Sequence, residues 1–332
     1  MSRNTALLSL FALLNLIAFT ADLMLGSIYI PLDELIGIFS GTSIPGDIHH
    51  EIALNLRLPK AITAVLTGAA LSVCGLMMQT LFRNPLADPY ILGVSSGAGL
   101  GVAITVMLSS ALPAALSAGS GWSMILSATT GALLILLLVV AVSFKVRNVV
   151  SLLIIGIMFG TICSSVITVL QNFSNPDSIK LFVMWTFGSL SAVTWNYMRI
   201  LAPVVLAGCI MAFVLQKRMD ALLLGENYAQ TLGIPIRRTR FLVVSIAGLL
   251  AGAITAFTGP IAFVGVAIPH MARGLFRSAS HRILLPACIL LGSLLLLVCD
   301  IITQIPAYTL PINTVSALFG APVIIWILIK KS

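Results

Sequence analysis

Long apolar stretches without a charged residue alternate with short charged segments along almost the whole chain. A helix needs about 20 apolar residues to cross about 30 Å of hydrocarbon, so most of these stretches can hold one membrane span. They cover residues 4–21, 61–82, 89–144, 148–176, 181–198, 200–216, 241–272, 283–299 and 301–329. The pattern predicts an all-α polytopic membrane protein, because an outer-membrane barrel would alternate apolar and polar residues in strands of about ten.

Two of these stretches are too long for one simple span. Residues 89–144 can hold two spans, since residues 109–121 at their midpoint have the small residues and the proline that let a chain turn. Residues 241–272 are interrupted at Thr258-Gly259-Pro260, which predicts a full span followed by a short, re-entrant-like eighth helix. Residues 172–195 are assigned to an outside loop with a short helix. The prediction is one domain over residues 1–332 with ten membrane helices.

Composition and charge agree with this pattern. The chain is 59% hydrophobic and only 8% charged, whereas a soluble domain carries roughly 25% charged residues. The positive-inside rule then fixes the orientation. With the N-terminus in the cytoplasm, ten spans place 14 of the 18 basic residues inside and only Arg57, Lys60, Lys180 and Arg199 outside. Both termini are therefore expected in the cytoplasm. A cleaved signal peptide over the first apolar segment is the alternative, and it would leave nine spans.

Several short motifs have a structural explanation that we prefer to a chemical one. Residues 93–97 match the G-x-S-x-G motif of serine hydrolases, but that motif needs a strand, a turn and a helix, and here it opens a membrane helix. Gly93, Gly97 and Gly101 recur at every fourth position, which favours close helix packing. No lysine completes a phosphate-binding loop, so we expect no bound ATP in this chain. The five cysteines fall in predicted spans and are expected to be buried apolar residues rather than metal ligands.

Ionisable residues inside a membrane span would indicate coupling to ions. Asp22 and Asp300 are the two candidates, and the predicted topology places both near the outer ends of their helices. An ion-coupled secondary transporter for a small solute is therefore an alternative with little support. A transporter of this composition is expected to take its energy from another protein.

The longest polar inside loop, residues 216–240, is the natural place for such a partner to bind. A short amphipathic helix lying across the membrane face would expose Glu226, Ala229 and Gln230 to a cytoplasmic protein. An ordinary linker with basic residues at the headgroups explains the composition equally well. On the outside, Arg57 and Lys60 lie one helical turn apart and can present charge on one patch to a soluble partner with carboxylates. The alternative there is snorkelling to lipid headgroups.

The motifs resemble those of the permease subunits of ABC importers for iron-siderophores, haem and cobalamin. The resemblance runs in order over roughly residues 52–331. It rests on the segments 57–60 (RLPK), 68–71 (GAAL), 83–89 (RNPLADP), 92–93 (LG), 224–226 (LGE), 232–233 (LG), 259–265 (GPIAFVG), 268–273 (IPHMAR), 281–282 (HR), 285–286 (LP), 310–311 (LP) and 320–322 (GAP), and on Gly75, Gln79, Ala229 and Asp300.

The resemblance implies partners on both sides of a bacterial inner membrane. It implies a second permease chain, expected to be identical, two cytoplasmic ATPases that hold ATP and magnesium, and one periplasmic binding protein. No cofactor, metal or nucleic acid is expected on this chain, and no enzymatic activity of its own. The coupling helices within residues 216–240 would enter a cleft on the ATPase.

The resemblance also implies roles for particular residues. The expected ATPase-coupling residues are Gly225, Glu226, Ala229, Leu232 and Gly233. Arg57 and Lys60 would dock the binding protein, and no such contact is assigned to Gln304. The expected cytoplasmic gate consists of Asn84, Pro85, Leu86, Val149 and Val150.

The implied mechanism is alternating access driven by ATP, with an uncharged path for a metal chelate. The sequence does not identify which chelate is carried, and it does not choose between a homodimer and a heterodimer. A weak internal similarity between residues 84–87, expected inside, and residues 259–262, expected outside five spans later, predicts an inverted repeat.

Overall fold

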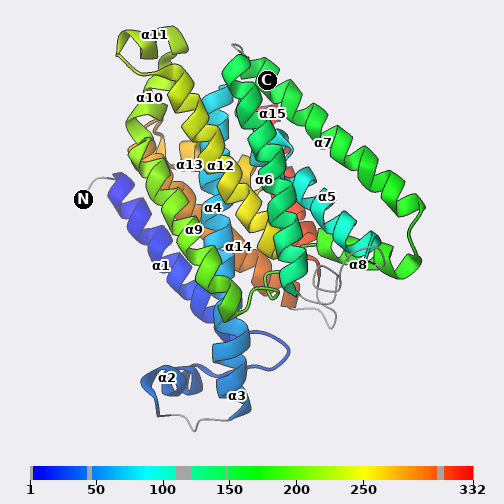
Figure 1. Cartoon of the computed structure of the whole chain (residues 1–332). Helices are drawn as coiled ribbons and strands as arrows, with labels where there is room; N and C mark the ends of the chain where they lie inside the picture. The colour runs from blue at the N-terminus through cyan, green and yellow to red at the C-terminus, as the bar shows by residue number, and fades with distance from the viewer. Residues whose placement is uncertain (1–2, 43–46, 110–120, 147–148, 305–309, 332) are drawn as a thin grey trace.

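A computed structural model describes residues 3–42, 47–109, 121–146, 149–304 and 310–331. All regular structure in these ranges is helical (Figure 1). The elements are α1 (Arg3–Met24), α2 (Leu32–Ser40), α3 (Ile48–Glu51), η1 (Ile52–Arg57), α4 (Leu58–Phe82), η2 (Pro89–Leu92), α5 (Val94–Met107), α6 (Gly121–Lys145), α7 (Val149–Asn172), α8 (Pro176–Thr186), α9 (Trp195–Val214), α10 (Gln216–Leu224), α11 (Glu226–Thr231), α12 (Ile236–Thr258), α13 (Val264–Phe276), α14 (His281–Gln304) and α15 (Ile312–Lys331).

The predicted spans coincide with α1, α4, α5, α6, α7, α9, α12, α13, α14 and α15. Within the described residues, seven helical segments are long and apolar enough to cross a membrane, and these contain α1, α4, α6, α7, α9, α12 and α14. Helix α5 has 14 residues and α13 has 13, so both are shorter than a full span. The all-helical membrane fold is confirmed, whereas the count of ten crossings and the inverted repeat stay predictions. The expected turn over residues 109–121 lies almost entirely outside the described residues.

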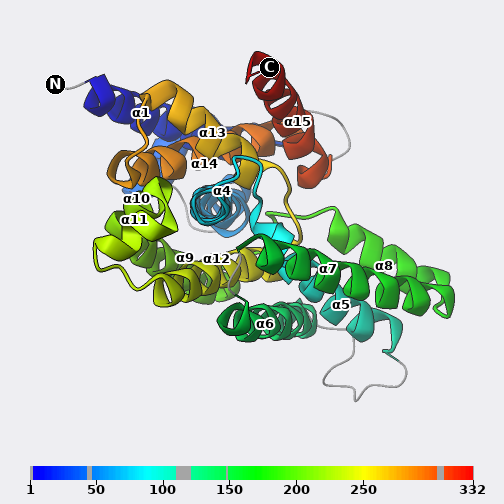
Figure 2. The same ribbon diagram turned by 90° about the horizontal axis from the view of Figure 1, so that it is seen from above.

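Helix α4 occupies the centre of the bundle, with α13 and α14 on one side and α9 and α12 on the other (Figure 2). Glycines let its backbone approach two neighbours. A Cβ atom at Gly68 would collide with the carbonyl of Gly292 in α14, and one at Gly75 would collide with the carbonyl of Gly265 in α13. Close approach of this kind is how membrane helices gain packing energy when lipid is as apolar as their side chains.

The glycine spacing near residue 93 has the same explanation. A Cβ at Gly97 would collide with the carbonyl of Gly131 in α6, and one at Gly101 would collide with the carbonyl of Ser127. The prediction that these glycines serve close helix packing is therefore confirmed. The five cysteines are also buried, as expected.

The predicted break after α12 is present, since the helix ends at Thr258 and regular structure resumes at Val264. Side chains from distant segments bind the irregular backbone between them. The amide of Ile261 donates to the hydroxyl of Tyr90 (3.3 Å), and the amide of Ala262 donates to Oδ1 of Asn313 (3.0 Å). Irregular backbone at membrane depth is tolerated where protein satisfies its polar groups in this way.

Short helices cover the two ends of the bundle (Figure 1). Helices α2 and α3 lie beyond one end, on the side where the predicted topology places the outside. Helices α10 and α11 lie at the opposite end, within the expected cytoplasmic segment 216–240. Helix α8 falls within the expected outside segment 172–195. The candidate functional residues are concentrated at these two ends.

Candidate functional site

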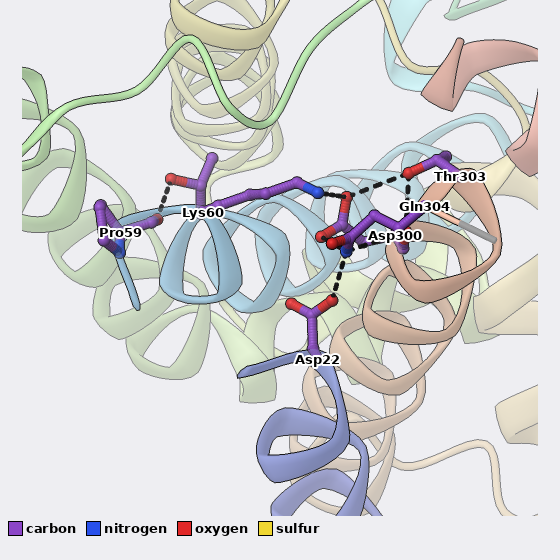
Figure 3. A network of polar contacts seen from close by, with 7 residues as sticks. Asp22, Pro59, Lys60, Asp300, Thr303 and Gln304 are labelled. Carbon is purple, nitrogen blue, oxygen red and sulfur yellow. Dashed lines mark hydrogen bonds and ion pairs between the residues drawn. The ribbon is translucent and has the colours of Figure 1, made fainter. Parts of the chain in front are cut away.

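A buried polar network, here called the outer cluster, consists of Asp22, Lys60, Asp300 and Gln304 (Figure 3). The Nζ atom of Lys60 lies 3.0 Å from Oδ1 of Asp300. The amide nitrogen of Gln304 donates to Oδ1 of Asp22 (3.0 Å) and to Oδ2 of Asp300 (3.3 Å). The cluster therefore joins the outer ends of α1, α4 and α14.

Burial makes this pairing necessary. Asp22 and Asp300 are each 2% exposed, and the side chain of Lys60 is 15% exposed. An isolated charge at such a site costs several kcal/mol, which an opposite charge and good hydrogen bonds can offset. Both aspartates lie near the ends of their helices, as predicted, whereas the outer side of the membrane stays a prediction and their contact was not predicted. One feature of the sequence could have predicted their contact: Asp22 and Asp300 are the two acidic residues expected inside spans.

Arg57 is held in the same region by backbone carbonyls. Its guanidinium donates to the carbonyls of Leu23 (2.8 Å), Met24 (2.9 Å) and Ile28. These carbonyls lie at or just beyond the end of α1, where a cation satisfies unpaired acceptors and opposes the negative end of the helix dipole. Arg57 is only 7% exposed.

The sequence prediction that Arg57 and Lys60 form an exposed patch is therefore wrong for the chain by itself. Both side chains turn inward to partners that are far away in sequence. Their role in docking a binding protein stays a prediction. Lys180 and Arg199, also expected outside, are exposed.

At the opposite end, the short helix α11 is fixed to the bundle through Glu226. Its carboxylate accepts from Nη2 of Arg240 in α12 at 2.9 Å, and Nη1 of the same arginine donates to the carbonyl of Val146 at 3.1 Å. The Arg240 side chain is almost wholly buried. From the sequence, Arg240 was expected only to be a basic residue on the inner face.

The expected exposure of the coupling residues needs one correction. Ala229 is 0% exposed and packs with Ala221, Leu222 and Ile236 under the short helix. Its small side chain lets α11 pack closely against these residues. Ala229 therefore positions α11 without being exposed to a partner itself. Gln230 is exposed as predicted.

Other residues form the exposed surface of this segment. Leu232 is exposed as a coupling residue would be, and Leu224 and Tyr228 are large exposed residues that the sequence analysis did not assign. Gly225 and Gly233 flank α11 with φ angles of 123° and 76°. Glycine adopts such positive φ values without the steric cost that other residues pay. The two glycines therefore set the turns by which α11 leaves and rejoins the chain.

The expected gate includes the turn that comes directly after α4, at residues 84–86. Arg83 ends that helix with a φ of 47°. Asn84 shapes the next turn, because its Oδ1 accepts from the amide of Leu86 at 3.0 Å. Leu86 and, on α7, Val150 are exposed. The side chain of Val149 lies outside the described residues, so the opposition of valines to this turn stays a prediction.

An open groove of about 340 Å³ runs between α7 and the segment formed by η2 and α5. It is lined by the uncharged residues Tyr90, Ile91, Gly93, Ser96, Gly156, Ile157, Gly160, Thr161 and Ser164. Hydroxyl groups give this surface polarity without a fixed charge. An uncharged path was expected, but its residues could not be selected from the sequence because they come from segments about 60 residues apart.

Comparison with known proteins gives a consistent result. The sequence profile of the FecCD transport family matches residues 13–330. The vitamin B12 import system permease proteins BtuC of Salmonella typhi and Salmonella newport are each 37% identical over 283 residues, which is 83% of this chain and 83% of theirs.

Two solved structures are similar in fold. A metal-chelate type ABC transporter in an inward-facing conformation aligns over 99% of this chain and 100% of its own, with a TM-score of 0.86 and 27% identity. PsaBC from Streptococcus pneumoniae, solved in complex with a Fab, covers 80% of this chain and 88% of its own with a TM-score of 0.51. At 15% identity, that match shows likeness of fold alone.

Proposed function

Because the chain belongs to the FecCD transport family, we propose that it is the permease of a binding-protein-dependent ABC importer for a metal chelate. Its relatives are permease subunits of ABC transporters, so the chain is a multi-pass inner-membrane transport protein and not itself an enzyme. The observation that carries the proposal is the fold match over 99% of the chain to a metal-chelate type transporter.

The proposed assembly contains a second permease chain, two ATPases and one periplasmic binding protein. The exposed apolar residues Ile154, Met158, Ile162 and Val166 recur at every fourth position on α7, which is the spacing of one helix face. This face supports pairing with a second copy of the chain. The ATPases would supply ATP and magnesium, because no phosphate-binding loop is present in this sequence.

The proposed mechanism is alternating access. ATP binding would close the two ATPases and move α11, and the groove beside α7 would change the side of the membrane that it faces. Both termini lie in the cytoplasm in this scheme. The uncharged, hydroxyl-lined groove supports passage of a large chelate, because no fixed charge in it would hold the cargo.

The proposed cargo class is a metal chelate, with cobalamin, iron-siderophores and haem as its candidates. The relatives named for vitamin B12 import favour cobalamin. Uptake of radiolabelled cyanocobalamin, ferrichrome and haemin by cells with and without the chain tests the choice. We expect one probe to accumulate only when the chain, its ATPase and its binding protein are all present.

The same assay separates the importer from an ion-coupled carrier. An ATPase variant that binds but does not hydrolyse ATP should abolish uptake, whereas a protonophore should not do so while ATP is maintained. Uptake that survives the ATPase variant and collapses with the proton gradient would instead favour a carrier that uses Asp22 and Asp300.

A variant pair tests the groove. Thr161→Trp fills it and should reduce uptake to background, because the cargo then lacks a path. Leu134→Trp places the same side chain at an exposed position of α6, away from the groove, and serves as the control. Equal uptake by the two variants would contradict the assignment of the path.

A further inference from the structure

Three polar side chains form a second network at the inner end of the bundle, here called the inner link. His281, the first residue of α14, is wholly buried. Its Nδ1 lies 2.6 Å from Oδ1 of Asp220 in α10, and its Nε2 lies 2.8 Å from Oγ1 of Thr80 in α4. The backbone amide of His281 also donates to Oδ1 of Asp220 at 2.8 Å. One histidine therefore connects three helices.

A hydrolytic function does not fit this arrangement of threonine, histidine and aspartate. Thr80 is 1% exposed, so no substrate can reach its hydroxyl. The same hydroxyl lies 2.8 Å from the carbonyl of Leu76 within its own helix. The three residues are placed to hold helices together rather than to attack a bond.

A separate contact joins α10 and α4 nearby. Nε of Arg83, at the end of α4, donates to the carbonyl of Leu222 in α10 at 3.2 Å. Arg83 immediately precedes the expected gate residues, and Leu222 lies shortly before Gly225 and α11. Helix α10 is therefore joined to the end of α4 directly through Arg83 and indirectly through His281 of α14.

Burial makes the inner link resistant to partial movement. If α10 moved away from α4 and α14 alone, the ring and the backbone amide of His281 would lose Asp220 at a buried position where water cannot replace it. Leaving a buried polar group without a partner costs more free energy than the hydrogen bond contributes to stability when it is made. The cost is greater when a charged group such as a carboxylate takes part. Movement of α10 is thus tied to movement of α14 through His281, and to the inner end of α4 through Thr80 and Arg83.

We propose that Asp220, His281 and Thr80 are positioning residues that make the gate turn at residues 84–86 move together with the coupling segment α10–α11. This inference rests on the proposed transport function. In this proposal the inner link transmits the movement of the ATPases to the gate turn. The contact between Glu226 and Arg240 has a different role, which is to fix α11 to α12.

Labelling of a cysteine introduced at Leu86 tests the proposal. Leu86 is exposed in the gate turn, whereas the chain's five cysteines are buried, so the unsubstituted protein provides a low background. The complete complex with its ATPases is placed in liposomes. The rate of maleimide labelling is then measured without nucleotide and after trapping with ATP and vanadate.

Matched variants distinguish linkage from simple folding. Thr80→Val removes the hydroxyl at constant shape, and Thr80→Ser keeps it. Thr63→Val makes the same change at another buried position of α4, where the hydroxyl's one bond among the described residues is to the carbonyl of Pro59 in its own helix. Asp220→Ala removes the other end of the inner link. Each variant is checked for co-purification with the ATPase and for its rate of ATP hydrolysis.

We expect nucleotide to change the labelling rate by about fivefold or more in the Leu86→Cys parent, in Thr63→Val and in Thr80→Ser. In Thr80→Val and Asp220→Ala the response should be lost although the ATPase still binds and hydrolyses ATP. An unchanged response in both of these variants would overturn the inner link while leaving the transport function intact. If the parent complex binds no ATPase, the proposed function fails and the inference fails with it.

Discussion

At the outer end of the bundle, two carboxylates face two cations in a space that excludes most water. Lys60 pairs with Asp300, Gln304 donates to Asp22, and Arg57 binds backbone carbonyls at the end of α1. Opposite charges attract strongly in such a medium, but an unmatched charge is correspondingly costly. The ion pair of Lys60 with Asp300 and the hydrogen bond from Gln304 to Asp22 explain how these side chains can lie so deep.

Lys60→Met tests this balance, because it removes the cation and leaves Asp300 buried without its ion-pair partner. We expect a loss of about 3 to 5 kcal/mol in stability, as is typical when one member of a buried pair is removed. Thermal unfolding of the purified chain in detergent is the measurement. The double variant Lys60→Met/Asp300→Leu should recover much of the loss, and additive losses would contradict the pairing.

Asp88 provides a prediction outside the membrane spans. Its Oδ1 accepts from the amide of Tyr90 at 2.7 Å and caps η2. Burial raises its pKa to about 6, and the bond from Tyr90 opposes this shift. The folded chain therefore holds the proton more tightly than the unfolded chain, so this group's contribution to stability is present below about pH 4 and lost as the pH rises through about 6.

Asp88→Asn should remove this pH dependence, since an amide keeps an acceptor for Tyr90 and does not ionise. The difference in melting temperature between Asp88→Asn and the unsubstituted chain should favour the variant more at pH 8 than at pH 5. A difference that is independent of pH would contradict the raised pKa. Taking the difference between the two chains cancels other titrations that they share.

At the scale of elements, apolar stretches predicted the helices well because a membrane span must satisfy its own backbone hydrogen bonds. Gly259 and Pro260 predicted the break after Thr258 because both residues end helices through their own backbone chemistry. The expected exposure of Ala229 was wrong because a six-residue helix carries too little periodicity to show which face is covered. That face depends on Ile236 and Ala221, which lie beyond its ends.

Gly75→Ala tests the close packing of α4 against α13. A Cβ at this position would collide with the backbone of Gly265, and backbone cannot move aside as a flexible side chain can. We expect a loss of about 1 to 3 kcal/mol in stability, measured by unfolding in detergent. Gly274→Ala in α13 is the control, because an added Cβ there meets nothing within 4 Å. Equal effects at the two positions would contradict the packing argument.

At the scale of the whole molecule, orientation in the membrane follows from the distribution of basic residues. Lys180→Cys should react with an impermeant maleimide in spheroplasts, because α8 is expected outside. Arg237→Cys should react only after the membrane is permeabilised. Both positions are exposed, and the buried native cysteines provide a low background. Labelling of both from the same side would contradict the predicted topology.

The sequence by itself determined the class of fold, the places where helices run and break, and the residues that carry family motifs. These properties depend on local hydrophobicity and on backbone chemistry, which neighbouring residues fix. Only the tertiary structure decided which charged side chains are exposed to a partner and which are buried in pairs. Arg57 and Lys60 turned inward to partners on α1 and α14, and Asp220 met Thr80 through His281. Such pairings join residues up to about 240 positions apart, and burial enforces them only after the helices have packed together.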